Sequence, residues 1–384
     1  MIYSKPIVLI MTDWYEPGFK AGGPIQSCKN IVDAFREKFS FFILTSDRDL
    51  GDKQAYPGIE TDTWLPLGEH VKIFYASPSY LDRRRFADIV REIKPEVVYF
   101  NSMFSLAFTL KPLWWLRNTK FRGRVILAPR GMLQHGALQK KTLKKKFFLT
   151  AFRSLGWHKQ IIFHATDEQE EQDIQRFFSQ HARIILAENI PNVDREPWQE
   201  RMKIPGRLNC IFISRIHPKK NLHFALSAMK QVSENCNLLL DVYGEEDDMI
   251  YSMDCRKKAE AVGGNSSVSF YGPLPHAQVF TTLKKYHLFV LPTLGENFGH
   301  SIYEALSAGV PVLISDKTPW RRLDEIPAGF DLPLQEPSAF ANKLEEFCKM
   351  DQEEYNKWSQ GAKDYADQFT DRIDFYGRYI SLFA

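Results

Sequence analysis

Residues 291–311 read LPTLGENFGHSIYEALSAGVP. This stretch continues an apolar run, 288–291, that is short and β-prone enough to be a buried strand. A loop with Gly295 follows. From about Gly299 onward, small and apolar residues recur at helical spacing, as expected where a helix lies close to a sheet: Ile302, Ala305, Leu306 and Gly309. The stretch therefore predicts a strand, a loop and a helix.

Two carboxylates frame this predicted corner, Glu296 in the loop and Glu304 on the helix, with seven residues between them. Glu304 lies a little over one turn into the helix, so both side chains can line one crevice and hold hydroxyl groups. The backbone amides around Phe298, Gly299 and His300 belong to the first helical turn, where unpaired N–H groups and the helix dipole favour a phosphate. The pattern indicates a site for a sugar joined to a diphosphate. A capped surface helix with two solvated acids is the alternative.

The spacing E-x-F-G-x-x-x-x-E-A-L-x-x-G-x-P-V, which begins at Glu296, resembles the signature of retaining glycosyltransferase family 4, also called glycosyl transferases group 1. The resemblance, which is to bacterial polysaccharide-type members, implies an α/β protein with the GT-B fold. In that fold two Rossmann-like parallel-sheet domains face a cleft, and the last helix crosses back to the N-terminal domain. It also implies that Glu296 contacts the donor sugar and Glu304 the nucleotide ribose. The other donor-binding positions that it assigns are Asn297, Phe298, Gly299, His300, Gly272 and Leu274.

The length of the chain and its alternation of predicted strands and helices agree with two such domains. A chain of 384 residues is long for one hydrophobic core, and strand-like runs alternate with helix-like runs from the first residues onward. A polar, proline-punctuated segment follows residue 190, and we expect it to be the linker. We predict an acceptor-binding domain at 1–195, joined by a C-terminal helix at about 368–384, and a donor-binding domain at 206–367.

Arg215 and Lys220 follow the strand predicted at 208–213, across its turn into a helix. A guanidinium and an ammonium in this arrangement can converge on one diphosphate. The segment resembles the family's R-x-x-P-x-K-G element, with Asn221 where glycine is common. The resemblance implies catalysis by stabilisation of the departing diphosphate, through Arg215, Lys220 and the helix start at Gly299. Basic residues on a solvated turn are the alternative.

The first strand, 7–11, leads into a glycine-rich loop that contains Lys20, Gly22 and Gly23. Adjacent glycines at a strand end let backbone amides approach a ligand closely. The resemblance places this loop near the donor phosphates and the acceptor. The triplet Asp47-Arg48-Asp49 is formally a D-x-D motif, but it lacks the context of a metal site. We therefore predict a solvated loop there and assign no metal site.

Three further residues after strands of the first half are candidate acceptor contacts. Arg130 and His135 follow the strand at 125–128, and Asn101 follows the strand at 97–100, where many relatives carry a histidine. Arg130 could hold an anionic group and His135 a hydroxyl. Structural roles at the strand ends explain Arg130 and His135 equally well, so both interpretations stay open.

No Asp or Glu occurs from Val97 through Thr166, although thirteen Lys and Arg residues lie there. A helix predicted at 104–116 is apolar over much of its circumference and carries Trp114 and Trp115. We expect this segment to make reversible contact with an anionic membrane surface or a lipid-linked diphosphate. A buried core helix and a basic face that only aids solubility are the alternatives. The densest cluster of lysines is Lys140, Lys141, Lys144, Lys145 and Lys146.

Five scattered cysteines, the lack of a secretory segment and the lack of a membrane-spanning run favour a cytoplasmic protein, peripheral at the inner face of the plasma membrane. We expect no cofactor and no metal, with a UDP- or GDP-linked sugar as the donor substrate. The predicted reaction transfers the sugar to a hydroxyl of a glycan or a lipid-linked acceptor in the synthesis of lipopolysaccharide O-antigen, capsule or exopolysaccharide. The rival hypotheses are a non-catalytic sugar-nucleotide binder and a nucleic-acid binder that uses 97–166, although we expect no nucleic-acid partner.

Overall fold

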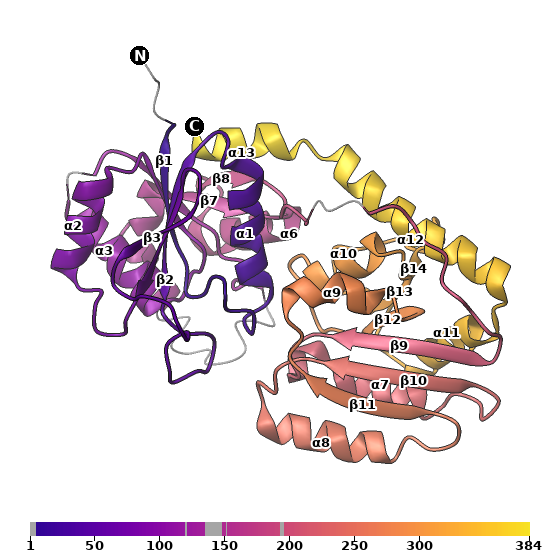
Figure 1. The fold of residues 1–384 in the computed structure, drawn as a ribbon. Helices are drawn as coiled ribbons and strands as arrows, with labels where there is room; N and C mark the ends of the chain where they lie inside the picture. Colours follow the sequence, from indigo (N-terminus) through magenta and orange to yellow (C-terminus); the bar gives the residue numbers. More distant parts are fainter. Residues whose placement is uncertain (1–4, 120, 135–147, 151, 193–195) are drawn as a thin grey trace. The chain divides into compact units, whose positions relative to one another are not determined.

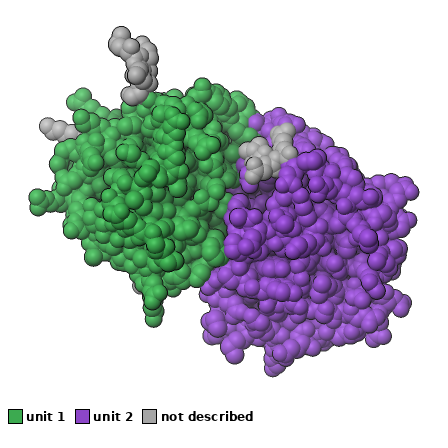
Figure 2. All heavy atoms as spheres, in the orientation of Figure 1, with its two compact units in different colours: residues 1–190, 374–384 green, residues 191–373 purple. Residues whose placement is uncertain are grey.

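The computed structural model describes residues 5–119, 121–134, 148–150, 152–192 and 196–384. The chain forms two compact units, Met1–Ile190 with Asp374–Ala384, and Pro191–Ile373 (Figures 1 and 2). Each unit is built around its own sheet. The units divide between residues 190 and 191 and between residues 373 and 374. The boundaries predicted from the sequence were 195–206 and about 368.

In the first unit the described residues form an eight-stranded sheet in which only the β3–β4 pair is antiparallel. In sheet order the strands are β3 (Trp64–Gly68), β4 (Val71–Ala76), β2 (Ser40–Ser46), β1 (Ile7–Met11), β5 (Val97–Phe100), β6 (Arg124–Leu127), β7 (Ile162–Ala165) and β8 (Arg183–Leu186). The helices whose bounds are described include α1 (Gly23–Phe35), α2 (Arg83–Ile93), the π-helix η1 (Leu106–Leu110), α3 (Lys111–Arg117), the 3-10 helix η2 (Trp157–Gln160), α6 (Glu168–Phe178) and α13 (Phe375–Phe383).

Helices cover both faces of this sheet, which explains why its central strands are apolar on both sides. Alternate residues of β1 enter different cores: Val8 and Ile10 pack with residues of α1 and α13, whereas Leu9 and Met11 pack with residues of α2, α3 and α6. The period-2 alternation of a strand therefore connects two hydrophobic layers.

The last helix, α13, belongs to the first unit, although α12 (Gln352–Arg372) belongs to the second. Arg378 pairs with Glu188 at 2.5 Å, and the Tyr379 hydroxyl donates to the Glu188 carbonyl at 3.1 Å. The Tyr379 ring stacks on Phe35 of α1 with centroids 5.4 Å apart. These contacts show how the aromatic C-terminal segment returns to the first unit, as the GT-B resemblance implied.

In the second unit the described residues form a six-stranded, all-parallel sheet. In sheet order its strands are β11 (Ser267–Gly272), β10 (Asn237–Tyr243), β9 (Arg207–Ile213), β12 (Leu288–Leu291), β13 (Val312–Ser315) and β14 (Gly329–Leu332). The helices are the 3-10 helix η3 (Pro218–Lys220), α7 (Leu222–Met229), α8 (Met249–Glu260), α9 (His276–Leu283), α10 (His300–Ser307), α11 (Pro337–Lys349) and α12. Because the strands are parallel, the loops after β9, β10, β11 and β12 emerge at the same edge of the sheet, where ligands bind in open α/β sheets.

The predicted apolar helix at 104–116 is divided into η1 and α3. Its two tryptophans differ in burial, since Trp115 is 6% exposed and Trp114 is 48% exposed. The helix therefore contributes to the core on one side and presents an aromatic ring to the surface on the other.

Candidate active site

The β12–α10 corner has the predicted strand–loop–helix form. Gly299 precedes α10 in a left-handed conformation, with φ 80°, which glycine adopts without strain. Within the described residues no side chain caps this helix start. Backbone amides at an uncapped helix start, together with the helix dipole, favour an anion.

Lys220 forms an ion pair with Glu296 in the loop between β12 and α10. The Lys220 Nζ lies 2.6 Å from Glu296 Oε1, and the two side chains are only 16% and 10% exposed. Burial by itself would raise the pKa of Glu296, but the charge and hydrogen bond of Lys220, with Lys219 nearby, hold that pKa below its usual value. The Glu296 carboxylate is therefore ionised at neutral pH and held in one place beside a cation.

The turn that carries Lys220 is fixed by local geometry. Asn221 adopts a left-handed conformation, with φ 57°, which explains why glycine or asparagine suits this position. The Lys219 carbonyl accepts from the Leu294 amide at 2.8 Å, which joins this turn to the loop after β12. Burial lowers the pKa of the Lys219 ammonium, because a desolvated cation is disfavoured.

Arg215 lies in the loop after β9, next to the loop after β10. A Cβ on Gly244 would lie 1.8 Å from the Ser214 carbonyl oxygen, so only glycine permits this close approach. The Ile216 amide donates to the Glu245 carbonyl at 2.8 Å, and the Arg215 guanidinium pairs with the Asp247 carboxylate at 2.7 Å. The acidic segment after β10 therefore supplies a direct partner for a predicted diphosphate-binding cation.

Glu304 projects from α10 toward α9. Its Oε1 atom lies 2.9 Å from Nε2 of His276, the first residue of α9. Gly272, with φ 73°, ends β11 and accepts from the Gly244 amide at 2.8 Å, whereas the Leu274 side chain packs against the hydrophobic core. The donor-site prediction did not include His276.

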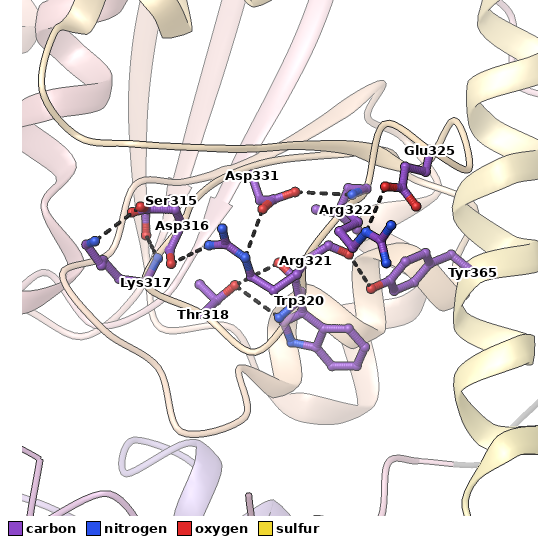
Figure 3. A network of polar contacts seen from close by, with 11 residues as sticks. Ser315, Asp316, Lys317, Thr318, Trp320, Arg321, Arg322, Glu325, Asp331 and Tyr365 are labelled. Atoms are coloured by element: carbon purple, nitrogen blue, oxygen red, sulfur yellow. Dashed lines mark hydrogen bonds and ion pairs between the residues drawn. The ribbon is translucent and has the colours of Figure 1, made fainter. Parts of the chain in front are cut away.

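Figure 3 shows a polar network after β13, and hydrogen bonds join the same segment to the Glu296 loop. The Ser315 hydroxyl donates to the Thr293 carbonyl, and the Glu296 amide donates to the Lys317 carbonyl at 3.0 Å. The Trp320 indole N–H donates to the Phe298 carbonyl. The same segment is tied to its neighbours by an Arg321–Asp331 ion pair and a hydrogen bond from Tyr365, as Figure 3 shows.

The Phe298 side chain is buried, with its ring centroid 5.2 Å from that of Trp320, and the His300 ring meets it at 4.8 Å. Phe298 therefore anchors the loop, and contact with a ligand at this position would come from its backbone. Asn297 lies half-buried in the same loop. The structure thus joins the loop after β12 to the turn that carries Lys219 and Lys220.

Residues 194–365 match the family model described as glycosyl transferases group 1. This match lies within the second unit and covers a little less than half of the chain. A phosphatidyl-myo-inositol mannosyltransferase from Mycobacterium leprae is 24% identical over 210 residues, which are 52% of this chain and 54% of that protein. An uncharacterized glycosyltransferase from Methanocaldococcus jannaschii, MJ1059, is 20% identical over 258 residues, covering 59% of this chain and 57% of that protein. The match thus covers little more than half the length of these curated relatives.

Solved structures resemble the whole chain. Anabaena HepE in complex with UDP and glucose aligns with a TM-score of 0.68 at 16% identity, covering 98% of each chain. WaaG, a glycosyltransferase involved in lipopolysaccharide biosynthesis, aligns with a TM-score of 0.63 at 16% identity over 96% of each chain. At these identities the likeness concerns the fold, and it confirms the predicted GT-B fold.

The first unit contains the candidate acceptor residues. The Arg130 guanidinium donates to Asn101 Oδ1 at 2.7 Å, to the Tyr99 hydroxyl at 2.7 Å and to Asn189 Oδ1. Asn101 also donates to the Pro24 carbonyl at 3.1 Å. This network favours the structural interpretation of Arg130, because its guanidinium already has three oxygen partners.

The loop with Lys20, Gly22 and Gly23 is anchored by Asp49. The Asp49 carboxylate accepts from the Phe19 and Lys20 amides at 2.7 and 3.1 Å, and the Lys20 ammonium pairs with Asp52 at 2.7 Å. Gly22 has φ 64° and precedes α1, which begins at Gly23. The loop is therefore held in shape by carboxylates from the segment after β2.

These contacts correct the sequence-based prediction of a solvated loop at Asp47–Asp49. Asp47 and Asp49 are both buried. Asp47 pairs with Arg48, and Asp49 holds backbone amides of the glycine-rich loop. The prediction was wrong because it considered only the local polarity of the segment, whereas Arg48 satisfies the Asp47 carboxylate and distant amides satisfy that of Asp49.

His135 and the lysine cluster from Lys140 to Lys146 lie outside the described residues. Within the described residues no group of three or more His, Cys, Asp or Glu side chains is arranged to hold a metal ion.

Proposed function

We propose that this protein is a retaining glycosyltransferase that moves a sugar from a nucleotide diphosphate sugar to a hydroxyl group. The observation that carries the proposal is the ionised Glu296 beside Lys220, 2.6 Å apart, at the uncapped start of α10 in a group 1 glycosyltransferase domain. The positive charge of Lys220 therefore lies beside the Glu296 carboxylate, which is a fixed acceptor for sugar hydroxyls.

In this mechanism the departing diphosphate is stabilised by Arg215, Lys220 and the amides that begin α10. Charge grows on the diphosphate as the sugar–phosphate bond breaks, so fixed cations and dipoles lower the barrier more than they strengthen donor binding. Glu296 holds the sugar in position and Glu304 holds the ribose. These groups supply the required positive charge, and we therefore propose a reaction that needs no metal ion.

The comparisons support a uridine nucleotide donor. HepE is described in complex with UDP and glucose, and Staphylococcus aureus TarM is described in complex with UDP. A GDP-linked donor remains the second candidate. For the acceptor we propose a glycan or a lipid-linked hydroxyl in bacterial surface polysaccharide synthesis, a proposal supported by the name of the mannosyltransferase relative and by the role stated for WaaG.

We propose a cytoplasmic enzyme that touches the membrane reversibly. Leu106, Trp114 and Leu155 are exposed on the first unit. Arg117 donates to the Leu155 carbonyl at 2.5 Å, and the Arg83 guanidinium lies 6.0 Å from the centroid of the Trp114 ring. The three apolar side chains and Arg117 belong to the acid-free segment 97–166, and Arg83 is contributed by α2. Exposed apolar side chains next to cations suit an anionic bilayer surface. No described helix has the length and apolarity needed to cross a bilayer.

Sedimentation with liposomes tests this contact. Binding to anionic vesicles should weaken with added salt, and it should fall further in a Trp114→Ala, Arg117→Gln variant, because each basic residue contributes about 1 kcal/mol near an anionic leaflet. An Arg91→Gln variant is the control, since Arg91 already pairs with Asp88. Equal sedimentation with neutral and anionic vesicles would refute the membrane contact and leave the transferase proposal intact.

The transferase proposal is tested by incubating the protein with a panel of UDP- and GDP-sugars and measuring release of the nucleoside diphosphate. One donor should be hydrolysed slowly even without an acceptor, and Lys220→Ala should abolish that hydrolysis. Tight binding of a sugar nucleotide without any release would favour the non-catalytic binder instead. Binding of random duplex DNA at physiological salt would favour the nucleic-acid hypothesis.

A further inference from the structure

His276 and Glu304 form a contact that the proposed mechanism does not use. His276 begins α9 and Glu304 lies within α10, so the two helices meet through the 2.9 Å contact between Nε2 and Oε1. The side chains are 24% and 14% exposed, which leaves them accessible to a ligand but sheltered from bulk solvent. Pro275 immediately precedes α9 and restricts the backbone that carries the imidazole.

A glutamate side chain has three rotatable bonds, and a single hydrogen bond to one carboxylate oxygen removes much of that freedom. When Oε1 is held by the imidazole, the carboxylate retains acceptor capacity on Oε2. The second oxygen is then presented in a fixed direction. Binding of a ribose hydroxyl to a pre-oriented carboxylate costs less entropy than binding to a freely rotating carboxylate, which must first become ordered.

We propose that His276 is a positioning residue that orients Glu304 toward the ribose and thereby sets the preference of the site for ribonucleotides over deoxyribonucleotides. This inference rests on the proposed function, because it takes Glu304 as the ribose contact. His276 acts through Glu304 and does not itself touch the reacting atoms.

A purely structural contact between α9 and α10 predicts something different. It predicts that removal of the imidazole lowers thermal stability and reduces the affinity for every nucleotide by the same factor. A positioning role predicts a selective effect, in which affinity for the ribonucleotide falls and affinity for the deoxyribonucleotide stays nearly constant. The ratio of the two affinities separates these alternatives even where the substitution costs some stability.

The experiment is calorimetric titration of the 384-residue chain with UDP, 2′-deoxy-UDP and 3′-deoxy-UDP, and with the matching GDP series. The wild type should prefer the ribonucleotide over at least one deoxy form by about 10- to 100-fold, the range for a hydrogen bond to a charged group. In His276→Phe the ratio should fall to within about threefold. His276→Gln should keep most of the preference, because its amide N–H can replace the imidazole N–H as donor.

Two further variants sharpen the test. The His223 Nε2 atom lies 2.9 Å from a carboxylate oxygen of Asp254 elsewhere in the same unit, so His223→Phe is a control that should leave the affinity ratio unchanged. In a Glu304→Ala background, His276→Phe should cause no further loss of the preference, since its effect passes through Glu304.

Retention of the wild-type affinity ratio in His276→Phe would overturn the inference and leave the proposed function standing. A further loss of the ratio on adding His276→Phe to Glu304→Ala would also overturn it, because the imidazole would then act independently of Glu304. If the wild type binds neither nucleotide series, both the proposed function and this inference fail.

Discussion

Replacing Lys220 with methionine removes one partner of the Lys220–Glu296 pair and leaves the carboxylate sheltered from water. Breaking a buried ion pair on one side costs about 3–5 kcal/mol. Here both side chains keep some exposure and Lys219 lies near the carboxylate, so we expect a smaller loss of stability, about 2–3 kcal/mol at pH 7. For a unit of this size each kcal/mol lowers the unfolding temperature by about 2–4 °C, which gives a decrease of about 4–12 °C.

The pH dependence follows from the lowered pKa of Glu296. In the wild type the stabilisation is present above the pKa of an unfolded glutamate, about 4.3, and is lost as the pH falls through the lower folded value. In Lys220→Met the remaining burial raises the pKa of Glu296. The loss of stability relative to the wild type is therefore largest at neutral pH and becomes smaller toward pH 4. Differential scanning calorimetry of the full chain at several pH values measures this difference.

A second substitution separates the lost charge partner from lost packing. Lys220→Met combined with Glu296→Gln should recover more than half of the stability at pH 7, because no uncompensated charge remains. Lys357→Met, which removes a partner from the exposed Lys357–Glu353 pair, should change stability by less than about 1 kcal/mol. An equal loss in the single and double variants at every pH would refute the assigned role of the pair.

Glu304→Ala should weaken nucleotide binding, measured by calorimetry, by about 1.5–3 kcal/mol. Glu296→Ala should mainly lower kcat in steady-state assays, and wild-type kinetics in both variants would refute the assignment of these residues to the donor site. Arg215→Ala should reduce kcat more than it raises the donor KM, whereas a change in KM alone would indicate uniform binding. Asp247→Asn should tighten nucleoside diphosphate binding by about 2- to 10-fold, since the ligand no longer competes with Asp247 for the guanidinium. EDTA should leave the rate unchanged; a rate abolished by EDTA and restored by manganese would contradict the proposed chemistry.

The parts of the fold that follow from local pattern were predictable. The alternation of strands and helices, together with the string from Glu296 to Val312, predicted two parallel-sheet units and the β12–α10 corner, and the GT-B fold is confirmed. The division of the 104–116 helix into η1 and α3 was not predicted, because a π-helical turn has no clear signal in apolar spacing.

The partners of the site residues were not predictable from one sequence. Asp247 is 32 residues from Arg215, and His276 is 28 residues from Glu304. Each pair forms because parallel strands bring successive loops to one edge of the sheet, and nothing in the spacing indicates which side chains then meet. The contacts between the segment after β13 and the Glu296 loop were not predicted either, because they are made to backbone carbonyls, which carry no sequence signature.

The measurement that tests the central claim most directly is proton NMR of the anomeric position during turnover of an α-linked nucleotide sugar. The account predicts that nucleoside diphosphate is released and that the first sugar product, observed before mutarotation, has the α configuration, with no signal change in Lys220→Ala. A first-formed β product would contradict the retaining mechanism. The absence of turnover with every UDP- and GDP-sugar, despite measurable binding, would contradict the assignment as a transferase.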